Sequence, residues 1–316
     1  MNRRKAVSMI GALVLTISAA AVITGCQHPD NTPGIPEKQA VFKLLFGATT
    51  LKLTAETVNG EPITVEGCTV ATLASGPETT LHVSGDTVVL KGDIKTLTCD
   101  KNELMSLDVS GLANLITLDC SLSKLYSLNV RGLTNLEKLT CDYNRLQNLD
   151  VQGLTKLQEL KCSYNFLRNL DVRGSADLKT LECKNNELRK LVVHGLAKLE
   201  TIACNDNNLT GLNLQGLTNL IALSCNNNGL TNLDVQGLSM LENLDCHRNR
   251  LPKTVFTKLF TDLPRRTHPA GYLLLYTEQT GVAESNYKAL ASELTGIRAK
   301  NWSVNKIDAG GTPVAL

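Results

Sequence analysis

Cysteine recurs in this 316-residue chain at a fixed interval of 21 residues. The series runs Cys99, Cys120, Cys141, Cys162, Cys183, Cys204, Cys225 and Cys246. A period of this length is typical of solenoids, in which one repeat cannot bury its apolar face alone and stacks on its neighbours. The spacing therefore predicts an array of eight 21-residue repeats over residues 94–252.

Each repeat follows the pattern L-x-x-L-x-C-x-x-N-x-L-x-x-L-x-V-x-G-L-x-x, which is almost unbroken from Leu136 to Lys156. Leu139 and Cys141 alternate with polar residues, and this period of two predicts a short strand with one face inward. Because the strands of successive turns lie side by side in a stack, we expect them to form a parallel β-sheet.

An asparagine stands three residues after the cysteine in seven repeats. An inward amide at that point can bond backbone groups that the turn leaves unpaired, which predicts an asparagine ladder. Its members are Asn102, Asn144, Asn165, Asn186, Asn207, Asn228 and Asn249. Ser123 replaces the asparagine in the second repeat, and Ser175 replaces an outer leucine in the fourth. A glycine such as Gly153 marks the return turn, where a positive φ costs this residue little.

The repeat frame resembles the leucine-rich repeats of the internalin type. It is most similar to repeats with a cysteine ladder, such as those of internalin J and of lipoproteins from Gram-negative anaerobes. The resemblance implies a leucine-rich-repeat solenoid, with a curved parallel β-sheet on the concave face and short irregular or 3-10 segments on the convex face. It also implies a surface-exposed protein that binds another protein.

The two flanks of the array predict caps for its open ends. Residues 41–93 contain short alternating segments broken by Gly, Pro and Asn, which predicts a small β cap. Residues 253–316 predict a small α/β cap: a helix in KTVFTKLFTDL, a strand in GYLLLYT, a second helix in VAESNYKALASELTGIRA and a last strand at Trp302. Cys68 falls outside the repeat register, and the sequence assigns it no role.

The N-terminal sequence predicts that the chain is exported. A basic segment, Asn2 to Lys5, precedes a short apolar stretch, and residues 1–25 are interpreted as a signal peptide. The sequence Ile-Thr-Gly-Cys at its end resembles a bacterial lipobox, which implies that Cys26 is lipidated and that residues 26–40 are the anchor and tether. The alternative is an ordinary signal peptide with an incidental cysteine. Since Gln27 follows the cysteine, the resemblance favours the cell envelope, at the outer membrane or cell surface.

The eight repeat cysteines are interpreted as buried, reduced core residues. Neighbouring parallel strands lie about 4.8 Å apart with parallel Cβ vectors, whereas a disulfide needs Cβ atoms about 3.8 Å apart. A line of thiols cannot surround a zinc ion tetrahedrally, so no metal site is predicted. Disulfides and metal binding remain the alternatives, which labelling of native thiols would distinguish.

Composition and motifs argue against several function classes. With 32 basic and 30 acidic residues, the chain lacks the excess of positive charge that nucleic-acid binding needs. The five histidines are scattered, and no nucleophile motif or carboxylate pair accompanies them. We therefore expect neither an enzyme nor a cofactor, and we expect a monomer.

The outward positions of the third and fourth repeats predict a binding site. Aromatic side chains with a charged rim are typical of binding hot spots. The candidate ligand-binding residues are Tyr143, Tyr164, Phe166, Lys138, Asp142, Arg145 and Lys161. The alternative is that the aromatic residues only cover a solvated edge. A second polar group, His247, Arg248 and Arg250, is interpreted as solvated surface.

Together these features predict an envelope lipoprotein that binds a protein partner, in adhesion or in a host or bacterial surface interaction, through the concave repeat face. The alternative function is a structural or accessory subunit of an outer-membrane assembly or uptake system.

Overall fold

The computed structural model describes residues 38–267 and 269–316, all within one compact unit, Ile35–Leu316. The predicted signal peptide, Cys26 and the tether up to residue 37 lie outside these residues, as do His28 and His268. The helices of the described part are too short or too polar to cross a bilayer.

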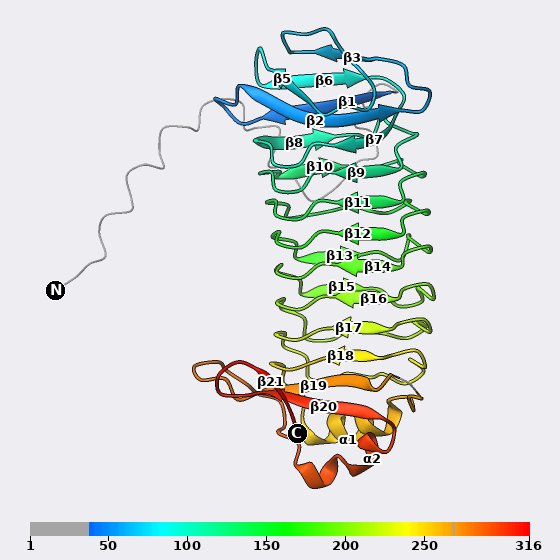
Figure 1. Ribbon diagram of the computed structural model, residues 1–316, viewed down its shortest axis with the longest axis vertical. Helices are drawn as coiled ribbons and strands as arrows, with labels where there is room; N and C mark the ends of the chain where they lie inside the picture. The colour runs from blue at the N-terminus through cyan, green and yellow to red at the C-terminus, as the bar shows by residue number, and fades with distance from the viewer. Residues whose placement is uncertain (1–37, 268) are drawn as a thin grey trace, which may run out of the picture. The chain divides into compact units, whose positions relative to one another are not determined.

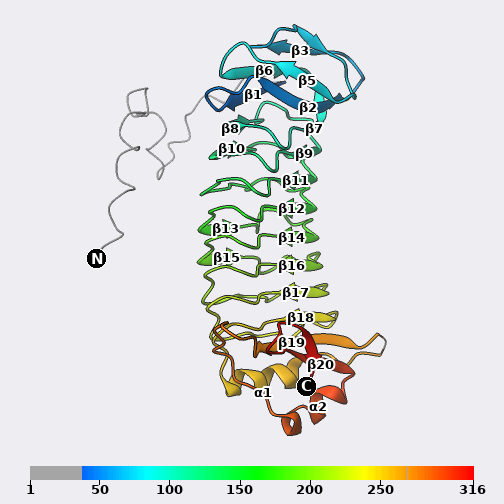
Figure 2. The same ribbon diagram turned by 60° about the vertical axis from the view of Figure 1, so that its left-hand side comes forward.

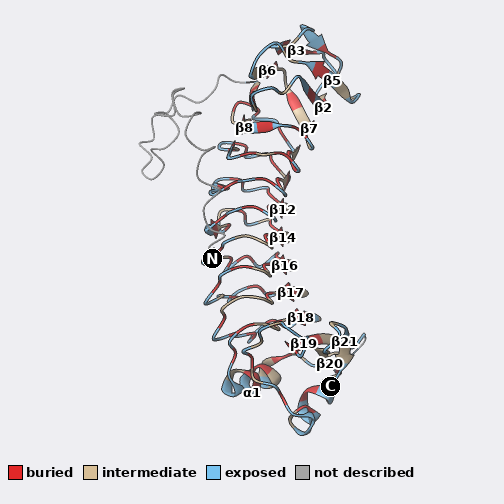
Figure 3. Ribbon diagram, turned by 90° about the vertical axis from the view of Figure 1, so that its left-hand side faces the viewer, coloured by how far each residue is buried: buried red, intermediate tan, exposed pale blue. Residues whose placement is uncertain are grey.

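The repeats stack into a solenoid with one strand of a long sheet in most turns (Figure 1). Each strand pairs in parallel with the strand 21 residues further on, so that Leu97, Leu118 and Leu139 are neighbours. The strands are β7 (Ile94–Thr98), β9 (Thr117–Asp119), β11 (Lys138–Thr140), β12 (Glu159–Lys161), β14 (Thr180–Glu182), β16 (Thr201–Ala203), β17 (Ala222–Ser224) and β18 (Asn243–Asp245). In Figure 3 the two ends of the stack bend toward the side that carries this sheet, which is therefore concave.

The interior of the solenoid is built from the inward columns of the repeat. Leu139, Leu160 and their equivalents are fully buried and face the same position in the next turn. Burying a leucine contributes about 2 kcal/mol, whereas ordering a residue costs about 1.5 kcal/mol. One turn of 21 residues cannot balance that cost alone, so stability comes from stacking.

The cysteines fill one of these inward columns. All eight repeat thiols are free and fully buried, and this burial raises the pKa of each. Cys68 is different, because it lies half-buried in the N-terminal cap at an isolated bridge to Val83. The structure therefore places the eight ladder cysteines in the core and Cys68 outside the ladder.

The asparagine ladder joins each turn to the one before. The Asn165 amide accepts the Leu146 N–H at 3.0 Å and donates to the Cys141 carbonyl at 3.0 Å and the Cys162 carbonyl at 3.2 Å. Ser123 breaks this pattern, and its hydroxyl instead accepts the Asn102 N–H at 3.4 Å.

A second, interrupted row of short strands runs along the other side of the turns (Figure 2). Its strands are β8 (Leu104–Asp108), β10 (Ser127–Asn129), β13 (Asn169–Asp171) and β15 (Lys190–Val192). The sequence predicted irregular or 3-10 segments here. The strands form because the L-x-V part of the repeat also alternates, with Leu128 and Val130 inward.

The N-terminal residues form antiparallel strands that begin both rows. They are β1 (Gln39–Leu44), β2 (Thr50–Thr57), β3 (Ile63–Glu66), β4 (Thr72–Leu73), β5 (Thr79–His82) and β6 (Thr87–Lys91). β2 pairs with β7, and β1 pairs with β8. The Asn102 amide bonds the N–H and the carbonyl of Lys52, so the asparagine ladder reaches into these strands.

At the other end the long sheet continues without repeats. β19 (Gly271–Thr277) and β20 (Trp302–Ile307) extend it in parallel, and β21 (Pro313–Ala315) ends it in antiparallel. The helices are α1 (Lys253–Asp262), η2 (Ala291–Glu293) and α2 (Thr295–Arg298).

The second predicted helix is wrong over residues 282–290, which have no helical structure. This segment supplies a last ladder residue instead. Asn286 accepts the Leu251 N–H at 2.9 Å and donates to the Cys246 carbonyl at 2.8 Å. Glu284 accepts the N–H groups of Arg248 and Thr277. The open end of the stack needs these acceptors, and a helix would carry them away from it.

Candidate functional site

One outward position in every turn has its backbone in the left-handed region. This residue comes two after the cysteine, and its φ lies between 51° and 56° in all eight turns. The column, counted from turn one to turn eight, is Lys101, Leu122, Tyr143, Tyr164, Asn185, Asp206, Asn227 and Arg248. The next residue in each turn is the ladder position, so this sharp bend is what brings the ladder amide inward.

The residue types in this column differ in how well they tolerate that backbone. Asn and Asp adopt it readily, and they fill turns five to seven. For a bulky residue it costs roughly 1–2 kcal/mol. Leu122, Tyr143 and Tyr164 nevertheless occupy it, and they expose 45%, 48% and 37% of their surface. Three successive turns thus hold an apolar side chain where it is locally unfavourable and points outward.

Tyr143 and Tyr164 stack on each other. Their ring centroids lie 4.2 Å apart, and the ring planes differ by only 8°. This follows from the fold, because equivalent residues of adjacent turns are about one strand spacing apart. One face of each ring is therefore covered by the other ring.

A hollow of about 450 Å³ lies close by, four to six residues after the cysteines of turns two to five. Tyr126 and Phe166, both half-exposed, line it together with Arg145, Arg168 and Glu187. The Arg145 guanidinium lies over the Tyr126 ring, 5.4 Å from its centroid, and donates to the Tyr126 hydroxyl. We call Leu122, Tyr126, Tyr143, Tyr164 and Phe166 the aromatic edge.

The concave sheet beside the aromatic edge carries charges that pair with one another. Lys161 lies 2.9 Å from Glu159 and 3.6 Å from Glu182, and Lys138 lies 3.9 Å from Glu159. Asp142 accepts the Ser163 N–H, and its partial burial raises the pKa of its carboxyl. The lysine and glutamate charges are therefore largely paired within the sheet.

The predicted site residues therefore fall into two neighbouring groups. Lys138, Asp142 and Lys161 lie on or directly after the concave strands, with the tyrosine pair at the strand ends. Arg145 and Phe166 line the separate hollow. Sequence reasoning missed Leu122 and Tyr126, although aligning the repeats in columns of 21 would have placed both beside the predicted aromatics.

The second predicted polar group is less solvated than expected. His247 and Arg248 are half-buried, while Arg250 is exposed. The His247 Nδ1 lies 2.5 Å from an Asp245 oxygen, and the Arg248 backbone N–H donates to Glu284. His247 and Arg248 therefore belong to the junction with the C-terminal segment. Across the described ranges, no three His, Cys, Asp or Glu side chains gather as metal ligands do.

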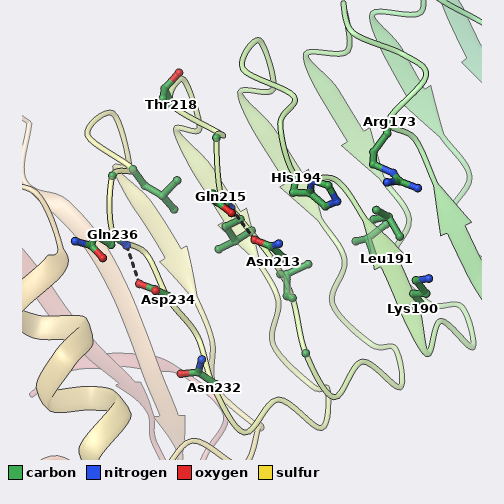
Figure 4. Close-up of a pocket in the computed structure, with 17 residues that line it drawn as sticks. Arg173, Lys190, Leu191, His194, Asn213, Gln215, Thr218, Asn232, Asp234 and Gln236 are labelled. Carbon is green, nitrogen blue, oxygen red and sulfur yellow. Dashed lines mark hydrogen bonds between the residues drawn. The ribbon is translucent and has the colours of Figure 1, made fainter.

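The other side of the turns carries a larger, more polar hollow of about 870 Å³ (Figure 4). Its floor includes Leu212, which is only partly buried although the equivalent leucines of neighbouring turns are buried. Polar side chains of turns four to seven surround it, among them Arg173, Lys190, His194 and Asp234.

A solved structure with the same architecture is the functional domain of InlJ from Listeria monocytogenes, described as including a cysteine ladder. It matches with a TM-score of 0.53 and 24% identity, over 72% of this chain. The chain has the internalin-type leucine-rich-repeat fold. The prediction of that fold from the repeat frame is confirmed, and the match spans 57% of the InlJ chain, less than two thirds of its length.

Looser matches include YopM from Yersinia enterocolitica, with 25% identity and a TM-score of 0.39 over 44% of this chain and 30% of that chain. YopM from Yersinia pestis, described as a leucine-rich effector protein, matches with 23% identity and a TM-score of 0.41 over 50% of each chain. No protein-family model matches the sequence, and neither does any curated protein.

Proposed function

We propose that this internalin-type chain is a protein-binding module whose aromatic edge contacts the partner. The observation that carries the proposal is the left-handed column. Tyr143 and Tyr164 hold a backbone conformation that favours Asn or Asp, and they are exposed there. Residues that cost folding energy and add nothing to the core are typical of binding surfaces.

The geometry favours a protein over a sugar or a nucleic acid. Sugars and bases bind aromatic side chains by stacking on a free ring face. One face of each ring in the Tyr143–Tyr164 pair is covered by the other ring, 4.2 Å away, so the pair offers fewer ring faces for stacking than two separate tyrosines would. Together with the Arg145 guanidinium over Tyr126, these are the residue types that dominate protein interfaces.

The proposed setting is the cell envelope, with lipidated Cys26 as the anchor and the repeats outside the cytoplasm. The Ile-Thr-Gly-Cys sequence supports this placement. Adhesion, or another interaction with a host or bacterial surface, is the role that such a setting favours. We include the concave charges of Lys138 and Lys161 as the rim of the contact.

The test exchanges both tyrosines for the residue that the backbone prefers. A Tyr143→Asn, Tyr164→Asn chain should keep or raise its melting temperature, while adhesion of a bacterium that displays it falls at least tenfold. The matched control is Asp206→Ala with Asn227→Ala in the same column, which should lower the melting temperature and leave adhesion unchanged. Unaltered adhesion of the Asn variant would contradict binding through the aromatic edge and favour the accessory-subunit alternative.

A further inference from the structure

A column of short polar side chains caps the backbone on the side of the turns away from the long sheet. In six turns an Asp or Asn oxygen accepts the N–H of the residue two positions later, at 2.9 to 3.2 Å. The capping residues are Asp108, Asn129, Asp150, Asp171, Asn213 and Asp234. Local capping of this kind satisfies an N–H that the turn would otherwise leave unpaired.

The fifth turn breaks this column. Val192 stands at the capping position, and its methyl groups cannot accept a hydrogen bond. The N–H of His194 consequently has no partner among the residues that the structure describes. Figure 4 shows the contrast: Gln215 is joined to Asn213 and Gln236 to Asp234, whereas no bond joins His194.

This uncapped N–H lies in the wall of the large polar hollow. Lys190 lies on the same face of β15 as Val192, and Arg173 lines the hollow from the turn before. The Arg173 guanidinium is held by Asp171, 2.7 Å away, and together with the nearby charge of Lys190 it lowers the pKa of the Asp171 carboxyl. Within the described ranges, Lys190 itself lies at ion-pair distance from no carboxylate. On the opposite wall, Asp234 is neutralised by Lys258 at 2.9 Å.

We propose that this hollow binds a carboxylate, with an oxygen accepting the His194 N–H beside the Lys190 ammonium. The choice of a carboxylate as the ligand rests on what fills the capping position in the other turns. In the other six turns the same place is filled by a planar carboxylate or carboxamide of the chain itself, so a carboxylate from outside makes the contact that Val192 does not. The site is separate from the aromatic edge and does not depend on the proposed function.

The test follows the backbone amide signals of the full chain by NMR during titration with sodium acetate, with succinate, and with a neutral heptapeptide that carries one central Asp. The His194 amide should shift and saturate, with a dissociation constant in the range of about 1 mM for a contact this small. A peptide that binds ten times tighter than acetate identifies a polypeptide carboxylate as the ligand, and equal binding identifies a free acid.

Two variants make the assignment specific. Val192→Asp supplies the missing cap from within, so it should abolish saturation at His194 while keeping or raising the melting temperature. Lys190→Gln should weaken binding several-fold, and Lys198→Gln, which removes an exposed lysine elsewhere in the turn, should not. An unsaturable wild-type signal, equal binding by Val192→Asp, or a large loss of stability in Val192→Asp would each overturn the proposal.

Discussion

The first four and the last four turns of the array have the same backbone and core but different outer edges. Leu122, Tyr143 and Tyr164 stand in the left-handed column of turns two to four, where turns five to seven have Asn185, Asp206 and Asn227. The exposed Tyr126 and Phe166 also belong to the first half. The difference teaches that the inward columns of such an array specify the fold, whereas the proposed recognition surface lies where one outward column departs from the residue that the backbone prefers.

The two halves share one continuous core, and the largest expected effect is on the stability of that core. Burial raises the pKa of all eight ladder thiols, whereas an unfolded thiol ionises near pH 8.5. A pKa that is higher in the folded state gives stability that is present below pH 8.5 and is lost as the pH rises. Each thiol should lower the free energy of unfolding by about 1.4 kcal/mol per pH unit above that value.

Urea unfolding measured between pH 7.5 and 10.5 checks this prediction, with fluorophores on the two halves as separate probes. Both halves should unfold together, and replacing Cys162 by Val should reduce the pH slope by the share of one thiol. Stability that stays constant up to pH 10, or halves that unfold apart, would show that the thiols do not share one buried core.

Loss of one ladder asparagine should lower the free energy of unfolding by the same amount in either half of the array. Asn165→Ala and Asn228→Ala each leave a buried N–H and two carbonyls without the amide, so each should lower the free energy of unfolding by about 2–3 kcal/mol. Chemical denaturation of the two variants gives the comparison. If one variant loses more than twice as much free energy of unfolding as the other, the inward columns also differ between the halves.

The smallest effect concerns the column that distinguishes the halves. Tyr164→Asn should raise the free energy of unfolding by about 1 kcal/mol, since Asn tolerates the left-handed backbone, and Asn227→Tyr should lower it by a similar amount. Thermal unfolding of both variants measures these changes. If Tyr164→Asn is destabilising, stacking with Tyr143 contributes more than the backbone costs, and the tyrosines then stabilise the fold without any need for a binding role.

Much of the fold could be predicted because the same residue pattern recurs in eight successive repeats. The inward Leu139 and Cys141 positions and the ladder amide were each visible as a column in the sequence. The segment around Asn286 could not be predicted, because its composition favours a helix while the end of the stack requires an acceptor for Leu251. In this segment, tertiary hydrogen bonding outweighs the local preference for a helix.

The candidate site was predictable only in part, for a different reason. Tyr143 and Tyr164 stood out as aromatic residues in polar surroundings, but their left-handed backbone and mutual stacking are properties of adjacent turns. Tyr126 and Phe166 are 40 residues apart in the sequence, and only the stacking of the turns brings both to the hollow that Arg145 also lines. The missing cap at Val192 could not be predicted, because only the structure shows that the six equivalent Asp and Asn side chains accept backbone hydrogen bonds.

Both ends of the array are joined to their flanking segments by the ladder bonds and sheet pairing that join one turn to the next. Asn102 bonds Lys52 as later asparagines bond the turn before them, and Asn286 bonds Cys246 and Leu251 in the same way. Neither flanking segment therefore requires one particular turn beside it. In-frame duplication or deletion of a 21-residue unit creates no new interface, so recombination between repeats can lengthen or shorten the array without a change in either flanking segment.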